Sequence, residues 1–119
     1  MTSLFQAMAL FLPVRIERVF WDGDTLMLFS KDWTFRTESV WRVSKDEDLL
    51  FTCWDDCASE LISIFSDQCI QVFSWLADGH PIDPCFKFSN GVVLSVFCSL
   101  STDPWVMEFA DGAVYVGNT

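Results

Sequence analysis

A hairpin signal in each half of the chain is the strongest constraint on the fold. The run Lys87–Leu94 turns at Asn90-Gly91, and both residues tolerate the positive φ that tight hairpins require. In the first half, the run Leu28–Phe35 turns at Lys31-Asp32 after a similar Phe-Ser pair. A shared pattern precedes the two hairpins, in Ile16–Trp21 and Ile70–Trp75. The sequence therefore predicts an antiparallel sheet built from two related halves.

The flanking segments add further strands. Alternation of polar and apolar residues over 34–39 predicts a strand that leads into Val40–Val43. Strands are also expected at Trp105–Phe109 and, after the Asp111-Gly112 turn, at Val114–Val116. The proline-rich segment Asp78–Pro84 is expected to be a loop.

Two segments favour helices. Leu4–Leu12 is apolar but far short of the ~20 residues that span a bilayer, so we expect a helix or strand of the core. The segment Asp56–Phe65 fits a helix that Asp55 or Asp56 caps, with Ala58, Leu61, Ile64 and Phe65 on one face. The predicted class is α+β: a twisted antiparallel sheet or two packed sheets, with one or two helices.

Composition indicates one folded domain over residues 1–119. The chain is 51% hydrophobic, with twelve Phe and six Trp, so its formal net charge of −10 does not indicate disorder. No basic segment precedes the apolar N-terminal run and no clear cleavage site follows it, which predicts a cytoplasmic protein without a membrane span. The apolar content leaves room for a homodimer interface.

The negative charge is concentrated in residues 46–86. This stretch holds nine acidic residues and no Lys or Arg, whereas residues 1–45 sum to +1 and residues 87–119 to −2. Such a local field attracts cationic partners and disfavours nucleic-acid phosphates. Solubility alone would also explain it, but we expect a docking face for a basic protein. Its predicted contacts are Asp46, Glu47, Asp48, Trp54, Asp55, Asp56, Glu60, Asp67, Asp78 and Asp83.

Other chemistry has weaker support. His80 is the only histidine, and a Cys-His or Ser-His system would have to use it, although it stands in a Gly-His-Pro sequence typical of a solvated loop. Cys53, Cys57, His80 and Cys85 make a plausible zinc set with imperfect spacing. Five Cys without a secretory signal predict reduced, mostly buried thiols. No phosphate-binding loop is present, so we expect no cofactor and no enzymatic activity.

The acidic, aromatic-rich composition and two of the hairpins carry a resemblance to a known class. The hairpins contain Phe88-Ser89-Asn90-Gly91 and Phe109-Ala110-Asp111-Gly112. In these features the chain resembles immunity proteins of bacterial polymorphic toxin systems, including contact-dependent growth inhibition. The resemblance implies a tight one-to-one complex with a toxin domain, often a basic nuclease, whose active site or substrate groove is covered. Carboxylates would then pair with Lys and Arg of the toxin.

Three alternatives stay open at this level. A DNA mimic would spread its carboxylates over an extended surface, spaced like phosphates. A small-ligand module or enzyme would have an apolar pocket with a few convergent polar groups. A zinc-stabilised domain would gather the cysteine and histidine ligands.

Overall fold

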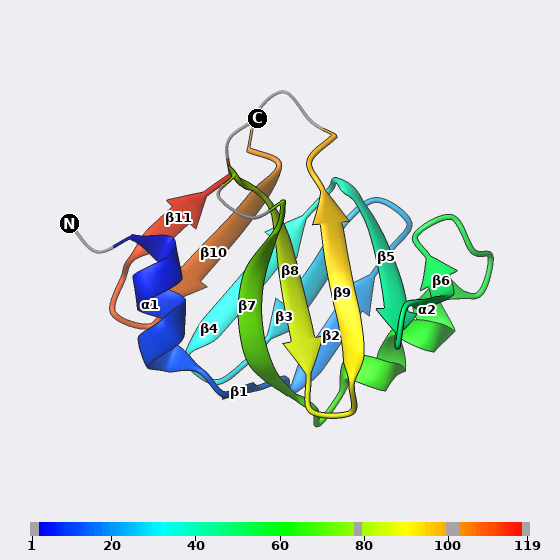
Figure 1. The fold of residues 1–119 in the computed structure, drawn as a ribbon, viewed down its shortest axis with the longest axis horizontal. Coiled ribbons are helices and arrows are strands. Elements are labelled where there is room, and N and C mark those ends of the chain that lie inside the picture. Colours follow the sequence, from blue (N-terminus) through cyan, green and yellow to red (C-terminus); the bar gives the residue numbers. More distant parts are fainter. Residues whose placement is uncertain (1–2, 78–79, 100–102, 118–119) are drawn as a thin grey trace.

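Two antiparallel sheets pack face to face and form the body of the protein (Figure 1). The computed structural model describes residues 3–77, 80–99 and 103–117. Within these residues the first half of the chain contains α1 (Leu4–Phe11), β1 (Val14–Arg15), β2 (Arg18–Trp21), β3 (Leu26–Phe29), β4 (Trp33–Thr37), β5 (Val40–Lys45) and β6 (Asp48–Thr52). The second half contains α2 (Ala58–Leu61), the 3-10 helix η1 (Ile62–Phe65), β7 (Cys69–Ala77), β8 (His80–Phe88), β9 (Val92–Phe97), β10 (Trp105–Phe109) and β11 (Val114–Val116). The α+β class is confirmed, and of the two predicted arrangements the packed sheets are the one observed.

The halves of the chain follow the same path. One sheet has the order β2-β3-β4-β10-β11 and the other β7-β8-β9-β5-β6, with β1 added beside β7. In each half three consecutive strands form a meander, and the next hairpin crosses to the opposite sheet. The repeat includes the helices. Ile16 and Ile70 are equivalent positions 54 residues apart, and the same offset relates Met8 of α1 to Ile62 of η1; all four side chains are buried. The predicted relation between the halves is thus present in the topology.

The core lies between the sheets and is largely aromatic. Along β4, Trp33, Phe35 and Thr37 are buried while the residues between them are more exposed, as expected for a strand with one face inward. Phe86 of the opposite sheet packs edge-on against Phe35, with ring centroids 5.0 Å apart. The sheets are therefore held together mainly by apolar burial and aromatic contacts.

The helices lie at the two ends of the sandwich. α1 is capped by Ser3, whose hydroxyl accepts a hydrogen bond from the Gln6 backbone N–H, and it buries Leu4 and Met8. At the other end, α2 packs against β2 and β6, and η1 packs against β2. Figure 1 shows α1 beside β11 at the left and α2 beneath β6 at the right.

The second helix differs from the prediction. It begins at Ala58 after Cys57, with no side-chain cap, so Asp55 and Asp56 do not cap it. The 3-10 turn that follows has a shorter period than an α-helix. As a result Ile62 is buried and Leu61 is 39% exposed, and the predicted apolar face is wrong at Leu61.

The expected loop at Asp78–Pro84 is also wrong over residues 80–84, where β8 already runs beside β7; Asp78 lies outside the described residues. β9 pairs with β8 only from Cys85 onwards. The first part of β8 therefore has β7 as its sheet neighbour. Pro81 and Pro84 are tolerated because no second strand of the described chain needs their missing N–H groups. The turns at Lys31-Asp32, Asn90-Gly91 and Asp111-Gly112 and the strands β10 and β11 are confirmed.

Candidate partner-binding site

The β5–β6 hairpin presents three acidic residues at its tip. Asp46 and Glu47 form the turn with φ of 52° and 70°, the left-handed conformation of tight hairpin turns. Asp48 opens β6, and all three side chains are exposed. The turn thus holds these carboxylates in solvent, beyond the core.

A second turn follows β6 and exposes an aromatic side chain. The Asp55 carboxylate accepts a hydrogen bond from the Thr52 N–H at 2.7 Å, and the Trp54 N–H donates to the Thr52 hydroxyl at 3.1 Å. The Cys53 N–H donates to the carbonyl of Trp41, which ties this turn to β5. Trp54 itself is 75% exposed. A large aromatic on a braced turn is typical of interface anchors.

The β2–β3 turn and Trp54 line the same hollow, which has a volume of about 550 Å³. Trp21, Asp22 and Gly23 line one part of it, and the remaining lining comes from Cys53, Trp54, Asp55, Asp56 and Ser59. Hydrogen bonds from the backbone N–H groups of Thr25 and Asp24 lower the pKa of Asp22, so this carboxylate is ionised at neutral pH. Three carboxylates and the indoles of Trp21 and Trp54 therefore line one opening.

We name as the acidic end the six acids on the β5–β6 hairpin, the turn after it and α2, together with Asp22: Asp22, Asp46, Glu47, Asp48, Asp55, Asp56 and Glu60. The sequence contains Asp22-Gly23-Asp24 as a carboxylate pair in a turn, but nothing in the sequence joins this turn to Trp54. Only the tertiary fold adds Asp22 and Trp21 to the site.

Two of the predicted contacts lie elsewhere. Asp67 precedes β7 and forms an ion pair of 2.7 Å with Arg15. The carboxylate of Asp83, in the middle of β8, accepts a hydrogen bond from the Cys98 N–H at 2.8 Å. Asp78 lies outside the described residues. The acidic stretch of the sequence is therefore not one continuous face.

The carboxylates of the acidic end have no cationic partners in the described part of the chain. Arg15–Asp67 is the one ion pair among these residues. Of the bases nearest in sequence, Arg42 lies 4.9 Å over the ring of Phe97. Lys45 stands opposite Asp48 in the hairpin register but lies beside Gly91 and forms no ion pair with a described residue. The charge of the acidic end is left for an external cation.

The structure does not bring together the candidate zinc set. Within residues 3–77, 80–99 and 103–117, no three His, Cys, Asp or Glu side chains are placed to hold a metal ion, so Cys53, Cys57, His80 and Cys85 are not brought together. His80 is exposed at the start of β8, opposite Ala77. All five cysteines are free, but Cys57 is exposed and the other four are half-buried, so the expectation of mostly buried thiols is wrong. Cys85 lies within β8 between two buried residues, and the other four lie at strand ends or in turns, partly outside the core.

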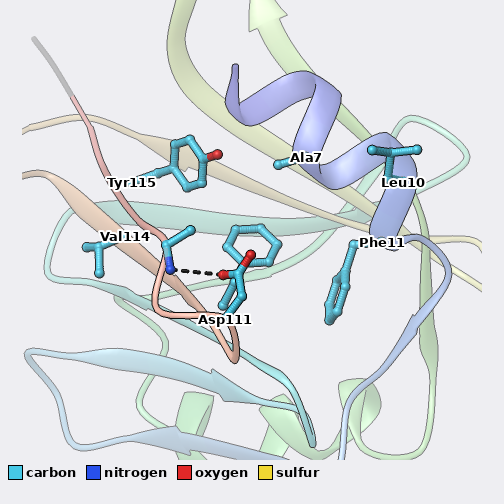
Figure 2. A pocket seen from close by; sticks show the side chains of 8 residues that line it. Ala7, Leu10, Phe11, Asp111, Val114 and Tyr115 are labelled. Atoms are coloured by element: carbon cyan, nitrogen blue, oxygen red, sulfur yellow. Dashed lines mark hydrogen bonds between the residues drawn. The ribbon is translucent and has the colours of Figure 1, made fainter. Parts of the chain in front are cut away.

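A second, larger hollow lies at the opposite end of the sandwich. It has a volume of about 570 Å³ and lies between α1 and the β10–β11 hairpin. Figure 2 shows Ala7, Leu10 and Phe11 of α1 across from Asp111 and Tyr115. Asp111 is engaged in its own turn, where its carboxylate accepts a hydrogen bond from the Ala113 N–H at 2.9 Å. The hollow is therefore mostly apolar, and the sequence analysis did not foresee it.

Comparisons with protein-family models, with curated protein sequences and with solved structures gave no significant match, so they assign the chain to no family. No helix among the described residues is long and apolar enough to span a membrane. The functional argument therefore depends on the geometry of the site.

Proposed function

We propose that the protein is a binding protein of the immunity type, which neutralises a cationic partner domain through its acidic end. The observation that carries the proposal is the set of seven acids of the acidic end, which form no ion pair with any described residue, together with the exposed Trp54 that shares a hollow with three of them. A basic nuclease domain of a toxin fits this charge, because the residues that hold nucleic-acid phosphates are Lys and Arg. Covering them would block substrate binding.

The hollow beside Trp54 suits the end of a long cationic side chain. Asp22, Asp55 and Asp56 line it without converging on a point where a metal ion could be held. An Arg guanidinium is larger and planar, forms several hydrogen bonds to carboxylates and stacks on aromatic rings. We therefore propose that an Arg of the partner enters between the indole of Trp54 and these carboxylates.

The concentration of acids at one end favours a globular protein partner over DNA mimicry as the basis of inhibition. A DNA mimic needs phosphate-like spacing along an extended surface, whereas Asp67 and Asp83 are engaged elsewhere. The five free thiols support the cytoplasm as the proposed compartment, because thiols stay reduced there.

The test starts from the gene beside the one that encodes this chain. We expect it to encode a cationic toxin domain, and we expect co-expression of the present chain to restore growth to cells that make this toxin. For the purified pair, the double variant Asp56→Lys/Glu60→Lys should slow association about tenfold at low salt, and the difference should shrink at high salt because exposed charges are screened. Both side chains are exposed, so the fold should be unaffected.

The matched control is Glu38→Lys/Glu108→Lys. Both residues are also exposed and the change in net charge is the same, but neither lies at the acidic end. Equal slowing by the two double variants would show a bulk charge effect and refute docking at this end. A neighbouring toxin that the chain neither binds nor neutralises would refute the immunity proposal itself.

A further inference from the structure

Among the described residues β11 is an edge strand with β10 as its sheet neighbour. Its outward backbone groups face away from β10. Hydrogen bonds from the Phe109 N–H to the Ala113 carbonyl and from the Gly117 N–H to the Trp105 carbonyl flank the pairing of β10 with β11. Bonded and non-bonded pairs alternate in an antiparallel ladder. The N–H and C=O groups of Val114 and Val116 therefore point towards the open edge of the sheet.

This edge lacks the usual protection against strand pairing. Natural edges carry charges, prolines or bulges, but β11 is Val-Tyr-Val, with Val114 56% and Val116 42% exposed. The edge strand β6 of the other sheet contrasts with it. β6 begins with Asp48, is bulged against β5, and has the Thr52 N–H occupied by Asp55.

The neighbouring helix extends the apolar surface. α1 contains no charged residue, and its Leu10 is 86% and Phe5 51% exposed. Hollows of about 570 and 280 Å³ lie between α1 and β11, and Tyr115 lines both (Figure 2). By contrast α2, the equivalent of α1 in the second half, packs directly on the edge strands β2 and β6. The repeat thus leaves one end of the sandwich closed and the other open.

The distribution of charge identifies the occupant of this edge. Asp111 is the one charged residue among those described that lines either hollow, and the acidic end lies at the far side of the molecule (Figure 1). The acids next to β11 are Asp111, which is engaged in its own turn, and Glu108 opposite Val114 on β10, so a cationic partner meets far less charge here than at the acidic end. Two copies of this chain, each with a net charge of −10, would meet there with their acidic ends pointing apart.

We propose that β11 pairs with β11 of a second copy, antiparallel and about a two-fold axis through Tyr115, so that the five-stranded sheets of both copies become continuous. In this register Val114 lies opposite Val116 of the second copy, and these residues exchange their outward N–H and C=O groups. A contact between identical surfaces is the commonest way in which soluble proteins form dimers. The acidic ends lie at the two extremities of the dimer, so each copy can still bind its own partner.

The first test is the mass of the full-length chain in solution, measured by light scattering and sedimentation equilibrium over a range of concentrations. A short strand with a few apolar side chains should give a dissociation constant on the order of 10 μM, so we expect twice the chain mass of 13.6 kDa at high concentration. Val116→Lys should weaken the dimer at least about tenfold, because it places a charge in the interface.

The matched control is Val72→Lys, since Val72 is 48% exposed beside Lys87 in the six-stranded sheet, whereas β11 belongs to the five-stranded sheet. This variant should dimerise like the wild type, and circular dichroism should confirm that both variants fold. A wild-type chain that remains monomeric at about 500 μM overturns the proposal, and so does a dimer that Val116→Lys leaves intact. If the wild type stays monomeric, the apolar surface of α1 and β11 would be a site for a different ligand.

A cross-linking experiment tests the register. Across the proposed axis the Cα atoms of the two Tyr115 residues would lie about 4.5 Å apart, as in non-bonded antiparallel pairs, which is within the range for a disulfide. Tyr115→Cys should give a covalent dimer under mild oxidation, whereas Val114→Cys should not, because the two copies of residue 114 would be too far apart. The wild type measures the background from the five native cysteines. Equal cross-linking by both variants overturns the proposed register.

Discussion

Removal of the Phe86 ring is the most direct test of the packing between the sheets. Phe86 comes from β8 and is fully buried. Its ring centroid lies 5.0 Å from that of Phe35 and 6.0 Å from that of Trp33, both on β4 of the opposite sheet. The ring also lies 5.4 Å from Phe73 on β7. Phe86→Ala would therefore open a cavity between the two layers.

The expected loss of stability is large for a domain of this size. Phe→Ala in a core lowers the free energy of unfolding by about 3–5 kcal/mol, and we expect about 4 kcal/mol here because rigid aromatic neighbours cannot collapse into the cavity. Domains have roughly 0.05–0.15 kcal/mol of stability per residue, which gives about 6–18 kcal/mol for 119 residues. The variant should thus fold, but with a much lower urea midpoint.

The assay is equilibrium unfolding in urea, followed by tryptophan fluorescence and circular dichroism. The control is Phe20→Ala, because Phe20 is 45% exposed on β2 and its removal should cost less than about 1 kcal/mol. A double-mutant cycle of Phe35→Ala with Phe86→Ala should give a coupling of about 1 kcal/mol, since the two rings touch edge to face. That coupling would report direct contact between two rings that come from opposite sheets.

Two results would refute the reasoning. A coupling below about 0.3 kcal/mol would be within the additivity expected of distant sites, so the two rings would not be in contact. A loss of less than about 1.5 kcal/mol for Phe86→Ala would place the ring outside a close-packed core.

Two further predictions concern the acidic end and the thiols. Trp54→Ala should raise the rate of dissociation from the cationic partner about 30-fold, as expected for a hot-spot side chain that contributes about 2 kcal/mol to binding. The unfolding midpoint of the variant should be unchanged. Surface plasmon resonance measures the dissociation rate, and an unchanged rate would show that Trp54 is not in the interface. Burial and the neighbouring carboxylate of Asp83 raise the pKa of Cys98 from 9.0 to about 12. At pH 8 iodoacetamide should therefore alkylate Cys98 at least about 100-fold more slowly than the exposed Cys57, because the thiolate is the reactive form; peptide mass mapping would show comparable labelling if this environment were absent. Because the folded-state pKa is the higher one, the thiol's contribution to stability should be fully present below pH 9 and lost as pH rises towards 12, a loss that Cys98→Ala should abolish.

The sequence predicted best where local chemistry decides the backbone. Asn90-Gly91 and Asp111-Gly112 specify turns because Gly91 and Gly112 adopt positive φ, and alternation specifies the strands beside them. The sequence predicted secondary structure least well where pairing with a neighbouring strand decides the backbone conformation. Residues 80–84 look like a loop by composition, yet β7 pairs with them and the absence of β9 at that point leaves room for two prolines.

The sequence by itself determined the α+β class, the hairpins, the relation between the halves and the uncompensated charge of residues 46–60, since each depends on residues close together in the chain. The tertiary structure decided which of these residues act together. The β5–β6 hairpin crosses to the sheet opposite β2, β3 and β4, and α2 packs against the edge strands β2 and β6. This arrangement places Asp22 of the β2–β3 turn beside Trp54 and Asp55. The fold also pairs Asp67 with Arg15 in an ion pair and places the Asp83 carboxylate where it accepts a hydrogen bond from the Cys98 N–H. The physical reason is that both sheets must bury one face, and the crossing that achieves this sets every distance between segments remote in sequence.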